Sequence, residues 1–315
     1  MMSLVNSASL NITNIDDVIG LTPAAKALTL TWTTIVIIIG VGGNGLVLLG
    51  SVKYQALRMD RMSIFLLECV AVTDMTITLF DFTSTFVTII ANEWVLGEKY
   101  CFFITLFEYV AYAVEIKLIT AIAIFRCVLI ARPFTVITDL TQGRKLLFVA
   151  SVVGYETCFI SSFFVFGYKV FFNPYMFVCD IQLSGKIGSL IITMCNVIGP
   201  GLVLISSNFY LLFKASMMSR DKLKKNSAKG LTTIMVLCWA FILSYGPFCV
   251  MIGLGFTEGG PPGWVVNLMN MSLGLNLFVN PLIYTFTNNR FFIFMKSMLG
   301  LSELSTAFLN RRQPA

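Results

Sequence analysis

The chain has 315 residues, of which 57% are hydrophobic and only 12% are charged, and its formal net charge is +6. An ordinary soluble domain carries roughly 25% charged residues, so this composition excludes that class and indicates a membrane protein. The apolar runs are long and continuous, which excludes the short alternating strands of a membrane β-barrel.

Seven apolar runs are long enough to cross the membrane as helices, because about 30 Å of hydrocarbon takes roughly 20 residues. We expect these helices at about residues 27–52, 62–92, 100–125, 146–168, 187–213, 230–257 and 263–287. The sequence therefore predicts an all-α membrane protein, a seven-transmembrane helix bundle with a short amphipathic eighth helix. The expected parts are an N-terminal tail (1–26), the helical domain (27–287), the eighth helix (288–300) and a C-terminal tail (301–315).

The basic residues indicate how the chain is oriented. Most of the 22 Lys and Arg residues fall on one set of span edges, which the positive-inside bias assigns to the cytoplasm. We therefore expect a multi-pass plasma-membrane protein with its N-terminus outside, and no cleavable signal peptide in residues 1–26. The sequon Asn11-Ile12-Thr13 then lies on the outer tail, where it can be glycosylated. Because the positive charge follows the loops rather than one folded face, we expect no nucleic-acid partner.

Two of the eight cysteines lie on the outer side. Cys101 begins the third run, and Cys179 lies in the loop between the fourth and fifth runs, in an oxidising location. We predict that they form a disulfide that ties this loop over the bundle. The chain has no histidine, so no zinc or haem site is expected.

The third run carries polar groups along one face. Glu108, Tyr112, Glu115 and Arg126 recur at helical spacing, so they share a face that must point into the bundle. Polar groups inside the membrane are costly and usually functional. The alternative is that these charges pair only to hold the bundle together.

Further polar residues are expected at the centre of the membrane. Asp74 and Glu115, with Asn44, Asn276 and Asn280, would form an oxygen-rich set that suits a hard monovalent cation or protons shared between carboxylates. A water-bridged packing network is the alternative. Lys117 lies off this face, and we predict that Glu156 neutralises it, since two unpaired charges against lipid would both be expensive.

Motifs in consistent order over residues 27 to about 300 resemble those of the rhodopsin-like G-protein-coupled receptors. They are Gly43-Asn44-Gly45-Leu46-Val47, Ala71-Val72-Thr73-Asp74, Trp94-Val95-Leu96-Gly97 with Cys101, Arg126, Arg132-Pro133-Phe134, Pro200, Cys238-Trp239, and Asn280-Pro281-Leu282-Ile283-Tyr284 with Phe291. The resemblance implies a receptor, not an enzyme, whose outer pocket binds an agonist and whose inner face activates a heterotrimeric G protein.

The resemblance also implies roles for single residues. The activation switch would comprise Arg126, Asp221, Trp239, Asn280, Pro281 and Tyr284. A site that resembles the family's sodium pocket, called the sodium-like site below, would comprise Asp74, Glu115, Asn276 and Asn280. Glu115 stands where the family generally has a residue with a small hydroxyl side chain. The G-protein face would comprise Arg126, Lys222, Lys224, Lys225 and Lys229, although these lysines serve equally as topology signals or lipid contacts.

The position of Glu108 matches the aspartate with which amine receptors bind a ligand ammonium. A cationic small molecule or a short basic peptide is therefore the expected agonist, in a pocket of Glu108, Tyr109, Tyr112, Asp81, Trp239 and Asn270. Retinal is not expected, because the opsin lysine position holds Gly274. No cofactor is implied, apart from a sodium ion at the centre.

Some positions depart from the family pattern. Phe125 replaces the acid that normally holds Arg126, Asn208 replaces the fifth-helix tyrosine that meets Tyr284, and Phe241 replaces the proline two residues after Cys238-Trp239. A constitutively active receptor without a natural agonist is therefore one alternative. A small secondary transporter, which would also carry charges at mid-membrane, is another.

Overall fold

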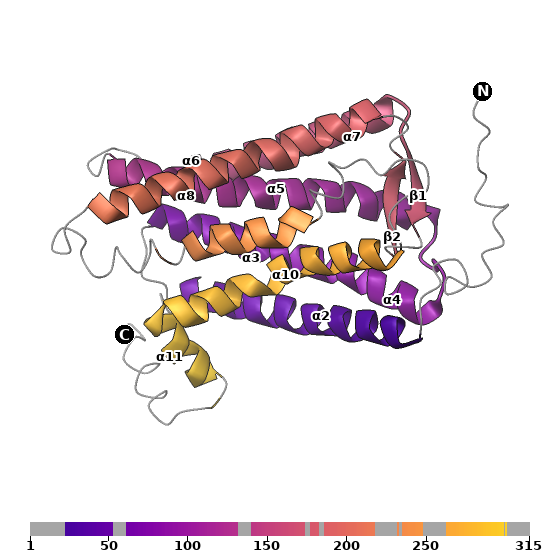
Figure 1. The fold of residues 1–315 in the computed structure, drawn as a ribbon, viewed down its shortest axis with the longest axis horizontal. Helices are drawn as coiled ribbons and strands as arrows, with labels where there is room; N and C mark the ends of the chain where they lie inside the picture. Colours follow the sequence, from indigo (N-terminus) through magenta and orange to yellow (C-terminus); the bar gives the residue numbers. More distant parts are fainter. Residues whose placement is uncertain are drawn as a thin grey trace.

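The computed structural model describes residues 23–52, 61–131, 140–173, 177–182, 186–217, 232, 235–247, 263–298 and 300. Its helices run lengthwise beside one another, with a two-stranded hairpin at one end and the last helix turned aside at the other (Figure 1). These two ends are called the hairpin end and the α11 end below.

The helices follow the seven predicted runs in chain order. In four of these runs the structure has one continuous helix: α2 (Pro23–Val52), α5 (Glu98–Ala131), α6 (Gln142–Val165) and α10 (Gly263–Thr287). The sixth run is described over the helix Met235–Pro247, and α11 (Asn289–Met298) follows α10.

The second and fifth runs each contain a π-helical turn. The second consists of α3 (Arg61–Ile77), the turn η1 (Thr78–Phe82) and α4 (Thr83–Ala91). The fifth consists of α7 (Lys186–Thr193), the turn η3 (Met194–Ile198) and α8 (Gly199–Met217). A π turn holds one more residue than an α turn and is often found at a functional site.

Length and apolarity identify four membrane-spanning candidates among the described residues: Pro23–Val52, Arg61–Ala91, Gln142–Val165 and Leu190–Lys214. Met235–Pro247 is apolar but shorter. α5 is long enough at 34 residues, yet it carries Glu108, Glu115, Lys117 and Arg126 along its length. A helix with that many charges is stable in a membrane only when it is enclosed by others.

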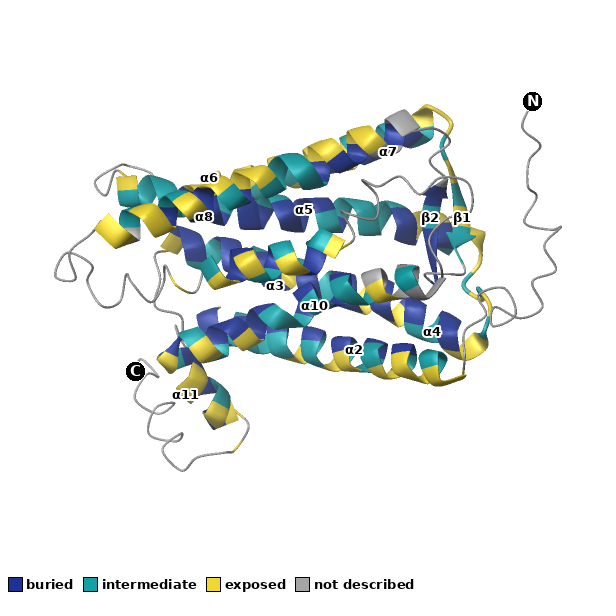
Figure 2. Cartoon of the chain, viewed as in Figure 1, coloured by how far each residue is buried: buried dark blue, intermediate teal, exposed yellow. Residues whose placement is uncertain are grey.

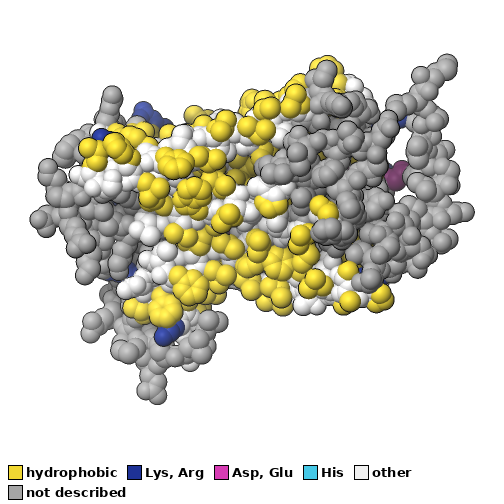
Figure 3. Space-filling view, in the orientation of Figure 1, with side chains coloured by type: hydrophobic (Ala, Val, Ile, Leu, Met, Phe, Trp, Pro, Cys, Tyr) yellow, Lys and Arg dark blue, Asp and Glu magenta, His cyan; other side chains and the backbone are white. Residues whose placement is uncertain are grey.

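Burial agrees with this arrangement, because the buried residues lie where the helices face one another (Figure 2). The outward surface is largely apolar across the middle of the molecule in Figure 3, as lipid requires. The interior contains an apolar core with Leu67, Leu118 and Ala123, and also fully buried polar groups such as Asp74 and Glu115.

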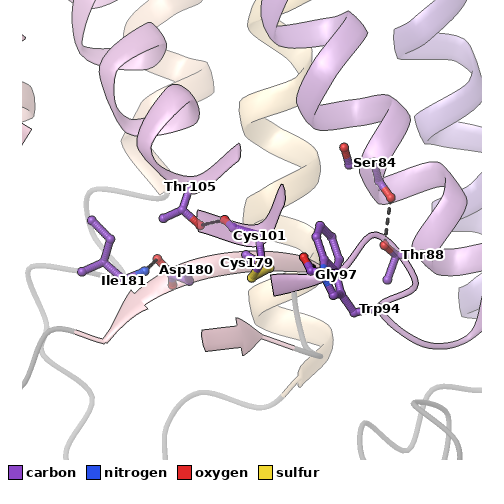
Figure 4. The surroundings of a disulfide bond; sticks show 9 residues. All are labelled: Ser84, Thr88, Trp94, Gly97, Cys101, Thr105, Cys179, Asp180 and Ile181. Atoms are coloured by element: carbon purple, nitrogen blue, oxygen red, sulfur yellow. Dashed lines mark hydrogen bonds between the residues drawn. A yellow bond between two sulfur atoms is a disulfide. The ribbon is translucent and has the colours of Figure 1, made fainter. Parts of the chain in front are cut away.

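Strands β1 (Lys169–Asn173) and β2 (Val178–Gln182) form the antiparallel hairpin, in which Phe172 is opposite Cys179. The predicted disulfide between Cys101 and Cys179 is confirmed, with a Cα–Cα distance of 5.5 Å. It fastens β2 to the first turn of α5 (Figure 4). The ring of Trp94 packs against Phe172, 5.7 Å between centroids, so the loop before α5 also contacts the hairpin.

α2 approaches its neighbours very closely at Gly40, Gly43 and Gly50, and the last two lie against ring side chains of later helices. A Cβ added to Gly43 would lie 2.9 Å from Pro281 in α10, and one added to Gly50 would lie 2.9 Å from Phe294 in α11. Glycine is therefore required by packing at both positions, rather than by an unusual backbone conformation.

Candidate functional site

The hairpin end of α5 carries acidic and phenolic side chains that point toward η1. The Tyr112 hydroxyl donates a hydrogen bond to Asp81 Oδ2 at 3.2 Å. Asp81 lies within the π turn and is 4% exposed, and its Oδ1 has no hydrogen-bond partner among the described residues. The π turn thus buries a carboxyl that still has an acceptor available.

Glu108 has two acidic neighbours. It interacts electrostatically with Asp81 of η1 and with Asp180 of β2, and both interactions are repulsive. In the part of the chain that the structure describes, none of these three carboxyls forms an ion pair with a lysine or arginine. This corner of the molecule therefore gathers three carboxyl groups without a described basic partner.

Asp180 belongs to this group, although sequence reasoning missed it. Its Oδ1 accepts hydrogen bonds from the Tyr109 hydroxyl and from the Ile181 backbone N–H, both at 2.7 Å. Burial raises the pKa of the Asp180 carboxyl above its ordinary value, and these hydrogen bonds oppose the rise. One signal was available in the sequence: Asp180 directly follows Cys179, whose bond to Cys101 brings it to α5 (Figure 4).

A second polar group lies in the middle of the bundle. Asn280 Nδ2 donates to Asp74 Oδ2 at 2.7 Å, and the Tyr245 hydroxyl donates to Glu115 Oε2 at 3.1 Å. The Asn276 amide donates to the other oxygen of Glu115. Asp74 and Glu115 also interact electrostatically. The structure thus brings together all four residues that the sequence predicted for the sodium-like site.

The central group fits a hard monovalent cation. Asp74 Oδ1 and Asn276 Oδ1 are buried acceptors without a hydrogen-bond partner among the described residues. Carboxylate and amide oxygens are the ligands that hard cations prefer. Asn44 has another contact, because its amide donates to the backbone oxygens of Leu277 at 2.7 Å and Gly40 at 2.9 Å. It links α2 to α10 beside the central group.

Trp239 does not lie where the sequence analysis expected it. Its side chain is 37% exposed and packs edge-on against Phe209, which is itself 59% exposed. The inward face of the helix Met235–Pro247 instead carries Phe241 and Tyr245, whose rings stack with centroids 4.2 Å apart. The physical reason is helical periodicity: Cys238, Phe241 and Tyr245 recur at steps of three and four, and Trp239 falls outside that face.

On this helix, the aromatic residue that contacts the outer polar group is Tyr245. Its ring contacts the ring of Tyr112 edge-on, with centroids 6.1 Å apart. Pro247 follows Tyr245 by two residues, which is the spacing at which the family pattern places a proline after the tryptophan matched to Trp239. The hydroxyl of Tyr245 reaches Glu115, so one side chain touches both the outer and the central groups.

At the α11 end, Tyr284 is 1% exposed and packs edge-on against Phe291 at 6.2 Å. A small cavity lies above it, lined mainly by apolar side chains with Asn280 and Tyr284. Asn208 donates to the Leu204 backbone oxygen at 2.9 Å, so this amide is engaged within its own helix. Arg126 is half-buried at the same end of α5.

The predicted ion pair between Lys117 and Glu156 is confirmed, with Nζ 2.5 Å from Oε1. Lys117 Nζ also donates to Asn196 Oδ1 at 2.7 Å, and Asn196 lies in the second π turn, η3. This three-residue group joins α5, α6 and the fifth run. Glu156 is fully buried, whereas Lys117 is 22% exposed.

Several predicted residues lie outside the described part of the chain. They are Asn11, Asp221, Lys222, Lys224, Lys225 and Lys229, together with the side chain of Asn270.

Comparison with known proteins gives three findings. The family described as "7 transmembrane receptor (rhodopsin family)" matches residues 43–284. A crystal structure of squid rhodopsin has a TM-score of 0.72, with 19% sequence identity, and covers 88% of this chain and 81% of its own. At that identity the likeness shows a shared fold.

A curated relative, a QRFP-like peptide receptor of Branchiostoma floridae, is 30% identical over 132 residues. The match covers 42% of this chain and 34% of that receptor, so it spans about a third of the relative's length. The structure and these findings confirm the predicted all-α bundle of seven transmembrane helices.

Proposed function

Because the chain belongs to the rhodopsin family of seven-transmembrane receptors, we propose that its hairpin end is extracellular and binds a cationic agonist, and that its α11 end activates a heterotrimeric G protein. Binding an extracellular ligand and coupling to G proteins are general properties of this family, whose members are not enzymes. The family assignment excludes the transporter alternative. A multi-pass position in the plasma membrane, with Asn11 glycosylated outside, is part of the same proposal.

The observation that carries the cationic agonist is the position of Glu108 beside Asp81. Both lie at the hairpin end, and Asp81 has an acceptor oxygen that no described donor uses. An ammonium or guanidinium group supplies donors and relieves the repulsion between the carboxyls at once. Tyr109 and Tyr112 border the acids, and their rings can add a cation–π contribution of about 0.5–2 kcal/mol.

A short basic peptide is one form of this agonist. The curated relative is named as a peptide receptor, which supports a peptide here through the 42% of the chain that the match covers. A basic side chain or a free N-terminus would then supply the positive charge. A small amine presents the same charge without the peptide, so both remain within the proposal.

Signalling requires that the agonist bind the active conformation more tightly than the inactive one, since only this difference shifts the population. The contacts from Tyr112 to Tyr245 and from Tyr245 to Glu115 support a route from the pocket to the centre. At the α11 end, movement of α10 at Pro281 and release of Arg126 would open the surface for the G protein. Lys222, Lys224, Lys225 and Lys229, which lie outside the described residues, belong to that proposed rim.

A sodium ion at the central group would be held by Asp74, Glu115, Asn276 and Asn280. Bound there, it would offset the charge of the two carboxyls and favour the arrangement in which α3, α5 and α10 meet.

The experiment is a screen of amines and short basic peptides with a promiscuous G-protein reporter, followed by Glu108→Gln. We expect this variant to lower the potency of a cationic agonist about 100-fold, which corresponds to about 2.7 kcal/mol of lost ion pairing. Glu98→Gln is the matched control, because Glu98 is exposed in the first turn of the same helix. Unchanged potency in Glu108→Gln at equal surface expression would contradict a cationic agonist.

A further inference from the structure

The hairpin adds a third carboxyl to the proposed pocket, and this carboxyl is held in position. Asp180 Oδ1 receives two hydrogen bonds of 2.7 Å, from the Tyr109 hydroxyl and the Ile181 backbone N–H. The neighbouring Cys179 is bonded to Cys101 of α5, so the strand that carries Asp180 is covalently attached beside the pocket. These two hydrogen bonds and the disulfide hold the Asp180 carboxyl in one orientation, as a group that binds a ligand must be held.

The three carboxyls form two acceptor positions rather than one. Tyr112 orients Asp81 and Tyr109 orients Asp180, and these tyrosines are three residues apart on α5. That separation corresponds to roughly 4.5 Å along the helix axis between the two tyrosine positions, and the tyrosines bind carboxyls from two different elements, η1 and β2. Glu108 interacts electrostatically with both.

A single cation would leave part of this arrangement without a partner. With a single ammonium at Glu108 and Asp81, Asp180 would remain beside Glu108 without a counter-ion among the described residues. Burial raises the pKa of the Asp180 carboxyl, which reflects the cost of holding that charge away from water. The unpartnered Oδ1 of Asp81, which is 4% exposed, shows that the deeper position also lacks a donor.

We propose that the agonist carries two positive groups, one bound by Glu108 and Asp81 and the other by Asp180, so that Asp180 selects dications over monocations. This inference rests on the proposed function, because it assigns the ligand class of the same pocket. Tyr109 is the positioning residue for the second group, since it touches Asp180 directly. Diamines and peptides with two basic groups fall in this class.

The experiment measures thermal stabilisation of the purified full-length receptor by two probes, 1,5-diaminopentane and 1-aminopentane. The probes share a carbon chain and differ by one ammonium group. Ligand binding to the folded state raises the melting temperature in proportion to RT ln(1 + [L]/Kd), so apparent affinities follow from titrations. We expect the diamine to bind at least about tenfold more tightly than the monoamine, a difference of about 1.4 kcal/mol.

Three variants assign this difference to residues. Asp180→Asn should lower the diamine affinity more than the monoamine affinity and so remove the preference, whereas Glu108→Gln should weaken both probes. Tyr109→Phe, which removes only the hydroxyl, should reduce the preference without removing the carboxyl. Glu98→Gln, exposed at the start of α5, serves as the control and should change neither affinity.

The outcomes separate the two proposals. If Glu108→Gln weakens both amines but Asp180→Asn keeps the diamine preference, the dication inference is wrong and the cationic pocket stands. Equal affinity of the two probes for the unsubstituted receptor would also show that the dication inference is wrong, while the cationic pocket stands. If neither probe stabilises the receptor at millimolar concentration, the dication inference fails, and the cationic pocket is then judged by the agonist screen alone. If both probes bind and Glu108→Gln changes neither affinity, both proposals fail together.

Discussion

Lys117 is the residue whose surroundings show best what an isolated charge requires inside a membrane. Its ammonium group pairs with the fully buried Glu156 and donates to Asn196. The free-energy cost of burying a charge was enough to predict Glu156 as a partner, because each of the two charges would be expensive without the other. The second partner could not be predicted, since Asn196 reaches Lys117 from a π turn that the apolar pattern of the fifth run does not reveal.

The charge pair gives a prediction for stability. Lys117→Met leaves Glu156 buried without its cation, and breaking a buried pair in this way costs about 3–5 kcal/mol. We expect low surface expression and a lowered melting temperature for Lys117→Met, and substantial recovery in the double variant Lys117→Met/Glu156→Gln. A double variant no better than the single one would show that the pair has no coupling energy.

Tyr245 shows the limit of motif spacing at the residue scale. Two aromatic candidates, Trp239 and Tyr245, lie six residues apart in the sixth run, and the Cys238-Trp239 dipeptide made the first look correct. Burial decides otherwise, because Tyr245 is 4% exposed and Trp239 is 37% exposed. The signal that favoured Tyr245 was Pro247, because the family pattern places a proline two residues after the aromatic residue and Pro247 stands two residues after Tyr245.

Among the elements, α2 is notable for how closely other helices approach it. Gly43 lies against Pro281, so α2 packs where α10 is interrupted by its internal proline. Helix interfaces in membranes favour such small residues because they allow close van der Waals contact. This contact connects the position of α2 to the Asn280-Pro281 segment that the resemblance assigns to activation.

A matched pair of glycines tests this contact. In Gly43→Ala the added Cβ would lie 2.9 Å from the Pro281 ring, and overpacking of this kind costs about 1–3 kcal/mol. Gly42→Ala meets no atom within 4 Å and should be neutral or slightly stabilising. We expect a lower melting temperature for Gly43→Ala than for Gly42→Ala. Equal values would mean that α10 yields to the added methyl group without cost.

The elements themselves were mostly predictable, for a simple reason. Continuous apolar runs identify membrane helices whatever their contacts, and all seven runs correspond to helices that the structure describes at least in part. The hairpin was not predicted, because β1 and β2 have only 5 residues each and lie between two long apolar runs that dominate the pattern. Asp180 was missed for that reason.

At the scale of the whole molecule, the balance between inactive and active conformations depends on contacts at the α11 end. The acid that would normally precede Arg126 is replaced by Phe125, which is 7% exposed and belongs to the apolar core. An aromatic side chain in that environment cannot accept hydrogen bonds from a guanidinium as a carboxylate does. Loss of a contact worth about 1 kcal/mol shifts a two-state equilibrium about fivefold.

We therefore expect ligand-independent signalling. Cells expressing the receptor without added agonist should show basal G-protein activation above that of empty vector, and Arg126→Ala at matched surface expression should reduce it. The measurement is a G-protein dissociation reporter normalised to receptor at the cell surface. Basal activity equal to the vector would show that Arg126 is restrained by something other than the missing acid, and would weaken the constitutive alternative.

The π turn η1 has a consequence for comparing this receptor with its relatives. One extra residue in a helix rotates everything beyond it by about 100° relative to an uninterrupted helix. A gapless alignment to a relative without this turn would therefore assign Thr83–Ala91 to the wrong face, and would exchange pocket-lining positions with lipid-facing ones. Against a relative of that kind, residue correspondences at this end of the second run need a one-residue gap within Thr78–Phe82, and ligand-specificity rules transfer only after that shift.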